Sequence, residues 1–357
     1  MKRLTLSGYY GYGNAGDEAV LAGLVQGFRA ARPDGDLELV ALSGDPAGTR
    51  REHRIQAADR YKPAALVRAI ANSDVFLSGG GSLLQDVTSA HSLFYYLGVV
   101  RLAQMLGKPT MFIAQGIGPL TLPRSRRLTA SVANRLSAVT VRDSDSAQLL
   151  RDVGVTKPPI EVTADPALLL GVPPAPNSGA TAPKGGVFGV ALRPWQRQEN
   201  LAEHVADACR TVLNNRHALL IPMQPRSDTV VMEQFARQWH QGKRTTLSPA
   251  EGGLPALLTG LASCELVIGM RLHALILAAA CGVPSVALSY DPKVDAFMRA
   301  SGQGDAVSDL QSSDSDAFAA LLARVWGERD ARAEALRSAL PDLRARAMRN
   351  VDVALGL

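Results

Sequence analysis

Cysteine is scarce in this chain of 357 residues, and the few that occur form no pattern. Cys209, Cys264 and Cys281 are odd in number, far apart and without a CxxC pair. These features exclude a disulfide framework and a cysteine zinc site. The histidines other than His273 show no spacing typical of metal ligands, so we expect no metal. Cysteines used in this way indicate a reducing compartment, and we expect a cytoplasmic protein.

Long apolar runs are also missing. The longest, Ala274 to Leu288, is interrupted by Gly282 and Pro284 and falls short of the roughly 20 residues that a membrane-spanning helix needs. The apolar stretch near the start, Leu4 to Leu6, is far too short for a signal peptide. We therefore expect neither a membrane span nor secretion by that route.

A strong charge imbalance is absent as well. The chain has 38 Lys and Arg against 33 Asp and Glu, a net charge of +5. This balance fits an anionic small molecule, a membrane surface or nucleic acid equally well. Basic clusters fit either peripheral contact with anionic lipid at the inner membrane face or a solvated helix face. These clusters are Arg124, Arg126 and Arg127, and in the tail Arg337, Arg344, Arg346 and Arg349.

What the chain does have is a regular alternation of short apolar runs with longer amphipathic stretches. This alternation predicts an α/β protein of βα units with parallel sheets. The length favours two domains, and 171–186, with eight Gly or Pro among sixteen residues, is the best linker candidate. We expect doubly wound, Rossmann-like domains at 1–170 and 187–357, the second with a helical tail, and an active cleft between them. The expected strands are 3–7, 37–42, 75–77, 110–114, 138–141, 160–162, 187–192, 218–221, 266–268 and 285–288.

The first strand runs into a glycine-rich turn, Gly8 to Glu18, followed by a helix. Its glycines match the G-x-G-x-x-G pattern of dinucleotide-binding folds. However, Asp17 and Glu18 stand in the first turn of that helix, where a diphosphate would have to bind, and would repel it. They suit a neutral hydroxylated ligand, near Asn14, or they cap the helix.

A second glycine turn, Ser78 to Asp86, also ends a strand. Gly80 and Gly81 would let the backbone approach a ligand closely, although a plain βα turn explains them equally well. No Lys-Ser or Lys-Thr follows, which excludes a nucleotide P-loop. Asp86 and Gln115 are candidate cleft residues because of their positions at strand ends.

Cations also follow strand ends. Arg142, Arg193 and Arg271 each come after an expected strand, and Lys293 follows the next one. Together they favour an anion site, since a guanidinium matches carboxylate or phosphate oxygens; the alternative is pairing with a neighbouring acid. His273 lies two residues after Arg271, a position suited to proton transfer near neutral pH.

The motifs together resemble the polysaccharide pyruvyl transferases, in particular the CsaB type, over about residues 3–300. The motifs that carry the resemblance are Gly8–Glu18, Gly79–Asp86, Ala114–Pro119, Arg142-Asp143, Ala164–Ala167, Gly269–His273 and Ser289–Lys293. The resemblance implies a GT-B-like fold, phosphoenolpyruvate as donor, a sugar hydroxyl pair as acceptor and a cyclic pyruvate ketal as product. In CsaB-like members the acceptor is N-acetylmannosamine in a lipid-diphosphate-linked cell-wall glycopolymer precursor, whose product anchors surface-layer proteins. This chemistry requires no cofactor.

The resemblance puts donor binding on Arg271, Leu272, His273, Lys293 and Arg142. From the residues themselves we add that phosphoenolpyruvate, with its carboxylate and phosphate, needs several cations. We expect His273 to protonate the donor, and Asp17, Glu18 or Asp86 to accept the hydroxyl proton. The further residues expected to bind substrate are Arg193, Asn14, Gly80, Gly81 and Gln115.

Three other functions remain open. The chain could be a GT-B glycosyltransferase that uses a nucleotide sugar, or a non-catalytic glycan-binding protein. A nicotinamide oxidoreductase ranks last. We expect no nucleic-acid partner, and a homo-oligomer is possible.

Overall fold

In a computed structural model the chain forms two compact units, Met1–Leu170 with Leu343–Leu357, and Gly171–Asp342. The structure describes all residues except 88–89, 172–185, 196–199, 249–251 and 311–313. The expected linker, 171–186, therefore lies almost wholly outside the described residues. Among the described residues, no helix is both long and apolar enough to cross a membrane.

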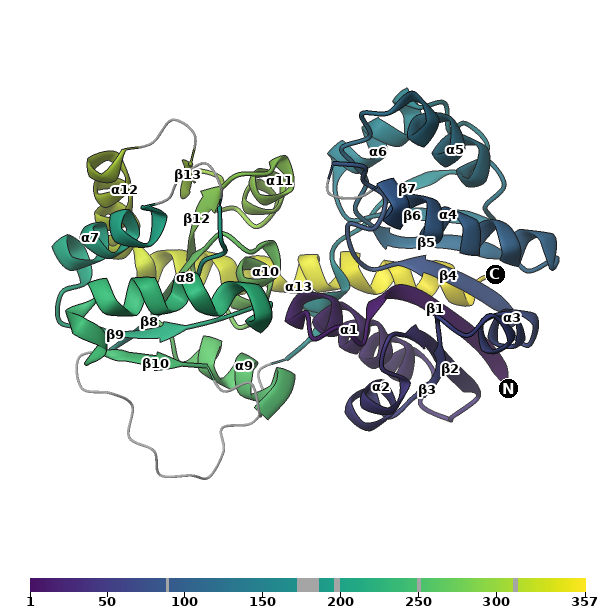
Figure 1. The fold of residues 1–357 in the computed structure, drawn as a ribbon, viewed down its shortest axis with the longest axis horizontal. Coiled ribbons are helices and arrows are strands. Elements are labelled where there is room, and N and C mark those ends of the chain that lie inside the picture. Colours follow the sequence, from purple (N-terminus) through teal and green to yellow (C-terminus); the bar gives the residue numbers. More distant parts are fainter. Residues whose placement is uncertain (88–89, 172–185, 196–199, 249–251, 311–313) are drawn as a thin grey trace. The chain divides into compact units, whose positions relative to one another are not determined.

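The first unit is a seven-stranded parallel sheet in the order β3-β2-β1-β4-β5-β6-β7. Helices cover both of its faces (Figure 1). Its elements are β1 (Lys2–Tyr10), α1 (Ala15–Ala31), β2 (Leu37–Ser43), α2 (Pro46–His53), β3 (Gln56–Asp59), α3 (Pro63–Ala71), β4 (Val75–Gly79), α4 (Ala90–Met105), β5 (Thr110–Gln115), α5 (Pro123–Ala133), β6 (Ala138–Val141), α6 (Ser144–Asp152) and β7 (Ile160–Val162).

The second unit is a six-stranded parallel sheet in the order β10-β9-β8-β11-β12-β13. Its elements are β8 (Val187–Ala191), α7 (Leu201–Leu213), β9 (His217–Leu220), α8 (Pro225–Gln238), β10 (Thr245–Leu247), α9 (Gly253–Ala262), β11 (Leu266–Gly269), α10 (Leu272–Ala280), β12 (Ser285–Ser289), α11 (Pro292–Ala300), β13 (Val307–Asp309), α12 (Ser315–Gly327) and α13 (Arg329–Leu355). The prediction of parallel α/β domains is confirmed.

Burial on both faces explains why the central strands are continuously apolar. In β1, Leu4 pairs with Leu39 of β2 on one side and with Val75 of β4 on the other. In the second unit, Trp239 is 0% exposed and packs its ring edge-on against Phe188, with centroids 5.3 Å apart. Each sheet is thereby held between helices, and its carboxyl edge carries the connecting turns.

The C-terminal end departs from the expected division. Sequence reasoning assigned 187–357 to the second domain, whereas Leu343–Leu357 of α13 packs with the first unit. The reason is a buried amide: Asn350 accepts hydrogen bonds from the hydroxyls of Thr140 (2.6 Å) and Thr163 (2.8 Å). The tail arginines are engaged there too, since Arg346 donates to the carbonyl of Thr163 and Arg349 pairs with Glu161.

Candidate functional site

The strand order reverses between β1 and β4 in the first unit and between β8 and β11 in the second. In open α/β sheets, ligands bind outside the carboxyl ends of the strands at such a switch point. Sequence reasoning placed candidate residues at both reversals.

In the first unit, the turn after β1 is held by the start of α1. Asn14 caps the helix, its Oδ1 accepting from the amide of Gly16 (3.0 Å). Glu18 accepts from the amide of Gly11 (2.7 Å) and hydrogen-bonds His53 Nε2 (2.9 Å). With its side chain 13% exposed and both oxygens used, Glu18 anchors the turn, and this does not fit the expected role of general base.

His53, Glu18 and Glu52 also form a group that could hold a metal. One ligand atom from each lies within 4.8 Å of the others. Glu52 is exposed, and the other two side chains already bond each other. The expectation of a metal-free protein stays a prediction.

The turn after β4 lies against α1. Gly80 has φ +77°, and a Cβ there would come 2.4 Å from a methyl of Val20. A Cβ on Gly81 would come 3.0 Å from Asp17 Oδ1. The structure therefore brings Asp17 and the two glycines together at the switch point, and close helix packing accounts for both glycines.

The side chains of Gln115 and Arg142 are buried, and both donate hydrogen bonds to the turn after β4. Gln115 is 0% exposed and donates to the carbonyls of Gly81 (2.8 Å) and Gly116 (3.0 Å). Arg142, 5% exposed, pairs with Asp165 (2.9 Å) and donates to the hydroxyl of Ser82 (2.6 Å). Neither position fits the expected substrate contact, because both side chains are buried and engaged. Of the two alternatives given for Arg142, an anion site or pairing with an acid, the structure shows the pairing, with Asp165.

Asp86 is likewise committed to the backbone. Its carboxylate accepts from the amides of Thr121 (2.8 Å) and Leu122 (2.8 Å) and from the Thr121 hydroxyl (2.9 Å), just before α5. Burial by itself raises the pKa of Asp86, but these hydrogen bonds outweigh it and hold the pKa below its usual value. A carboxylate so stabilised is a poor base, which argues against the expected catalytic role.

Sequence reasoning missed a cation and its aromatic neighbours in the same unit. Arg60, 5% exposed, donates to the carbonyl of Gly8 (2.7 Å), and its guanidinium lies 4.7 Å from the ring centre of Tyr95 and 5.1 Å from that of Tyr96. It also lies 5.5 Å from the Tyr12 ring. Burial is the main cause that raises the pKa of Tyr96, to about 12, so the tyrosine stays neutral.

The Tyr12 ring connects this buried group to a tyrosine at the surface, Tyr61. Tyr12 stacks on Tyr9, with ring centroids 4.2 Å apart, and its hydroxyl bonds that of Tyr61, which is 67% exposed. Arg60 directly follows β3, so the strand-end rule used for the other arginines would have found it. That strand was not predicted.

In the second unit, cations follow three adjacent strands. Arg193 comes after β8, Arg271 after β11 and Lys293 after β12, all at the carboxyl edge of the sheet. The Arg193 guanidinium donates to the hydroxyl of Tyr290 (3.0 Å) and lies 5.1 Å from its ring centre. Trp195 contacts the same tyrosine, with ring centroids 4.8 Å apart. Among the described residues, no partner bonds Arg193 Nε.

Arg271 is paired with an acid that sequence reasoning missed. Its Nε donates to Asp228 Oδ2 (3.1 Å), and its Nη2 donates to Asp228 Oδ1 and to the Ser227 hydroxyl (3.2 Å). Asp228 is 0% exposed and also accepts from the amide of Gln224 (2.9 Å). Both acid and hydroxyl stand in the first turn of α8, after β9, which is again a strand end. Within the described residues, Nη1 of Arg271 takes part in no hydrogen bond.

His273 lies in the first turn of α10, beside the buried Leu272. It is partly buried, whereas the other residues of that helix are buried. Lys293 pairs with Asp291 (2.7 Å), which caps α11. The two side chains are 30% and 22% exposed, so this ion pair is far more accessible than that of Arg271.

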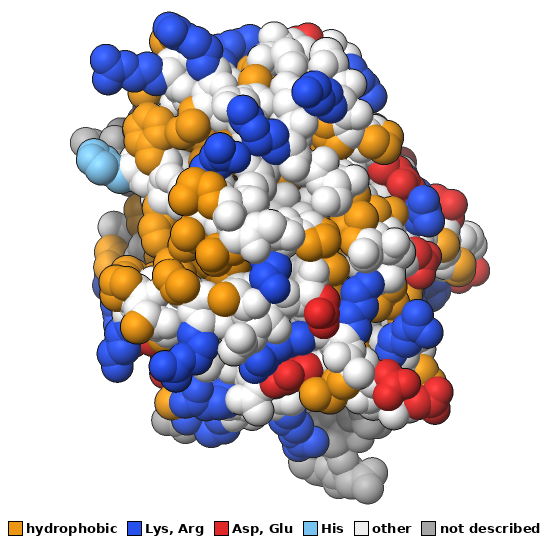
Figure 2. Space-filling view, turned by 90° about the vertical axis from the view of Figure 1, so that its right-hand side faces the viewer, with side chains coloured by type: hydrophobic (Ala, Val, Ile, Leu, Met, Phe, Trp, Pro, Cys, Tyr) orange, Lys and Arg blue, Asp and Glu red, His pale blue; other side chains and the backbone are white. Residues whose placement is uncertain are grey.

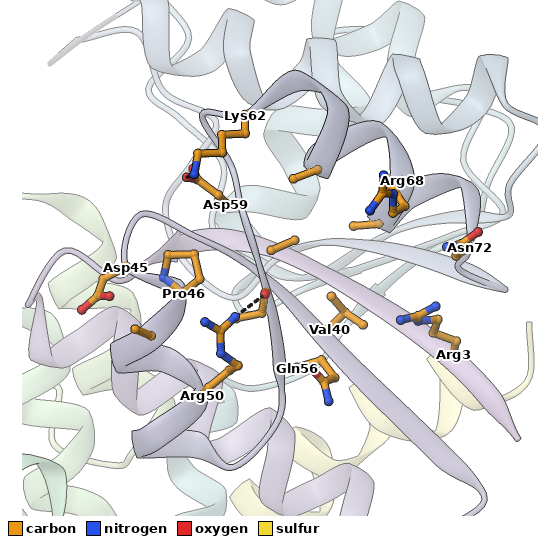
Figure 3. Close-up of a pocket in the computed structure, with 15 residues that line it drawn as sticks. Arg3, Val40, Asp45, Pro46, Arg50, Gln56, Asp59, Lys62, Arg68 and Asn72 are labelled. Atoms are coloured by element: carbon orange, nitrogen blue, oxygen red, sulfur yellow. Dashed lines mark hydrogen bonds and ion pairs between the residues drawn. The ribbon is translucent and has the colours of Figure 1, made fainter.

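A separate hollow of about 550 Å³ lies at the outer edge of the first sheet, between α2 and α3 (Figure 3). None of the predicted site residues lines it. Three of its four cations are engaged: Arg50 donates to the carbonyl of Ala57 (2.9 Å), Lys62 pairs with Asp59 and Arg3 with Glu38. The fourth, Arg68, is exposed on α3. We therefore place no ligand there.

The model of the polysaccharide pyruvyl transferase family matches residues 14–292. The chain belongs to the polysaccharide pyruvyl transferase family. The chain is also similar to the amylovoran biosynthesis protein AmsJ of Erwinia amylovora, with 22% identity over 371 residues. The match covers 87% of this chain and 88% of AmsJ.

Solved structures show the same architecture as this family member. HepE from Anabaena, in complex with UDP-glucose, matches with a TM-score of 0.65 at 13% identity, with 100% of both chains covered. A glycosyltransferase from Rickettsia africae matches with a TM-score of 0.64 at 9% identity, covering 99% of this chain and 97% of its own. At these identities the likeness shows the fold alone, which is of the GT-B type, as predicted.

Proposed function

We propose that this protein transfers the pyruvyl group of phosphoenolpyruvate to two hydroxyls of a saccharide and forms a cyclic ketal. The observation that carries the proposal is the row of Arg193, Arg271 and Lys293 at the switch point of the second unit, in a chain of the pyruvyl transferase family. The donor is a small, highly charged anion, and such a row suits it.

The two ion pairs of that row play different parts. The Arg271–Asp228 pair is buried and fixed, so Asp228 aims the guanidinium and leaves Nη1 to bind a donor oxygen. The Lys293–Asp291 pair is partly exposed, and such pairs contribute only about 0–1 kcal/mol. An incoming carboxylate or phosphate therefore displaces Asp291 from Lys293 at little cost.

His273 supplies the proton. It protonates C3 of the donor, which turns the methylene into a methyl group and makes C2 electrophilic. One saccharide hydroxyl adds to C2, the C2–O bond to phosphate breaks, and the second hydroxyl closes the ketal. Of the two hydroxyl protons, one restores the protonated acid and the other leaves with phosphate. Each such acid–base step is worth on the order of 100- to 10,000-fold in rate.

The acceptor belongs to the first unit. Tyr12 and Tyr61 offer rings and hydroxyls of the kind that pack against a sugar. The buried guanidinium of Arg60 lies 5.5 Å from the Tyr12 ring. Asp17 is the proposed base, since Glu18 and Asp86 are committed to backbone amides. Transfer requires donor and acceptor to meet, and the active cleft expected between the two domains stays a prediction.

The resemblance to the CsaB type supports a more specific acceptor, N-acetylmannosamine in a cell-wall glycopolymer precursor carried on a lipid diphosphate. The family itself supports only a polysaccharide precursor. Surface-layer anchoring of the product follows from the CsaB-type acceptor and is proposed with it.

The test is phosphate release from phosphoenolpyruvate by the purified protein, with and without a lipid-diphosphate disaccharide. Release should depend on the acceptor, and mass spectrometry should find the acceptor heavier by one pyruvate less one water. UDP-glucose in place of phosphoenolpyruvate separates the glycosyltransferase alternative. Phosphate release without acceptor dependence, or glucose transfer from UDP-glucose, would overturn the proposal.

A further inference from the structure

A long stretch of the first unit contains no acidic residue. Between Asp86 and Asp143 the sequence has seven cations and neither Asp nor Glu. The whole chain has a net charge of +5, so the remainder is net negative by two charges. The seven cations are Arg101, Lys108, Arg124, Arg126, Arg127, Arg135 and Arg142.

Most of these cations lie on two neighbouring helices. On α4, Phe94, Arg101 and Met105 are exposed and share one face, since they lie seven and four residues apart, two turns and one turn of the helix. On α5, which packs against α4, Arg124, Arg127 and Leu128 are exposed in the same way. We call these six residues the basic-apolar surface. Figure 2 shows a face of the molecule on which Lys and Arg side chains lie among hydrophobic ones.

The apolar members are large and well exposed. Phe94 is 39% exposed, Met105 68% and Leu128 36%. Single exposed apolar residues are ordinary on protein surfaces. Here they alternate with cations, and the structure gives the side chains of Arg124 and Arg127 no hydrogen bond or ion pair within the residues it describes.

We propose that the basic-apolar surface docks reversibly on an anionic lipid bilayer. Cations attract anionic headgroups, while Phe94, Met105 and Leu128 enter the boundary between headgroups and acyl chains. Nucleic acid would use the cations but give the apolar side chains no partner, so a bilayer accounts for more of the surface. The inner side of α4 carries Tyr95 and Tyr96 beside Arg60, so one helix joins the bilayer to the proposed acceptor residues.

The experiment is sedimentation of the full chain with phosphatidylcholine vesicles that contain or lack phosphatidylglycerol. We expect binding only to the anionic vesicles, weakened by salt. The double variant R124Q/R127Q should bind about 30-fold more weakly, at roughly fivefold for each near-surface cation. The matched control is R226Q/R237Q, which removes two exposed arginines from α8 and should bind like the wild type.

A second variant tests the apolar part. F94S/L128S should weaken binding while the net charge is unchanged, which separates insertion from simple charge attraction. Circular dichroism checks that each variant is folded. Equal binding of R124Q/R127Q and wild type, equal binding to both vesicle types, or stronger binding to a short RNA than to anionic vesicles would each overturn the proposal. None of these outcomes depends on catalysis, so the result stands apart from the test of the proposed function.

Discussion

Replacing Arg271 by methionine should destabilise the second unit, because the guanidinium neutralises a carboxylate that solvent cannot reach. Asp228 is 0% exposed and Arg271 only 16%, and the contact uses both carboxylate oxygens. Removing one partner of a buried ion pair costs about 3–5 kcal/mol. We expect about 3 kcal/mol, the lower end of that range, since the Gln224 amide and the Ser227 hydroxyl still bind Asp228.

Differential scanning calorimetry measures this effect. At roughly 2–4 °C per kcal/mol for a domain of this size, the transition of the second unit should fall by about 6–12 °C. Asp228→Asn removes the carboxylate charge that Arg271→Met leaves unpaired. The double variant Arg271→Met/Asp228→Asn should therefore recover part of the lost stability, with a coupling energy of about 0.5–3 kcal/mol. Arg226→Met on the same helix is exposed and should stay within about 0.5 kcal/mol of wild type. A transition for Arg271→Met as high as that of Arg226→Met would refute the reasoning.

The remaining predictions concern the reaction and its acids. His273→Ala should lower kcat by about 100- to 10,000-fold with little change in the phosphoenolpyruvate KM, measured by phosphate release; full activity would remove the proton-donor role. Asp17→Asn should lower kcat by at least about 100-fold, whereas Asp86→Asn should leave kcat near that of wild type; the reverse order would make Asp86 the base. Asp86→Asn should instead lower the melting temperature, since the lost helix-start contacts contribute about 1–2 kcal/mol. Because the folded pKa of Asp86 is depressed, this contribution is complete above about pH 4 and is lost as the pH falls through the folded pKa. The melting-temperature difference between wild type and Asp86→Asn should therefore be constant near neutral pH and close in acid.

The central strands were predictable because they are buried on both faces and read as continuous apolar runs. β4 and β11 are examples, with every residue buried. The edge strands β3, β10 and β13 were not predicted. They have three or four residues each, and β3, of sequence QAAD, has no fully buried residue, so no apolar run marks it. The loss of β3 also hid Arg60.

The candidate residues were found because they follow the ends of strands. A position at a strand end says where a side chain lies along the sheet edge, but not which acid it pairs with. It located Arg271 and Arg142 equally well. Which acid each would meet depends on contacts far apart in sequence, Asp228 for Arg271 and Asp165 for Arg142. Among the described residues, those contacts leave Nη1 of Arg271 without a hydrogen bond, whereas Arg142 is buried and donates to Ser82 in the second glycine turn.

The division of the first unit between two distant stretches of chain has a consequence for synthesis on the ribosome. Residues 1–170 emerge well before 343–357, with the whole second unit made in between. Until Asn350 arrives, the hydroxyls of Thr140 and Thr163 lack the amide oxygen that both donate to in the finished protein. The first unit to be translated is therefore the last to be completed, and a nascent chain must keep its nearly finished sheet intact while a second domain is built behind it.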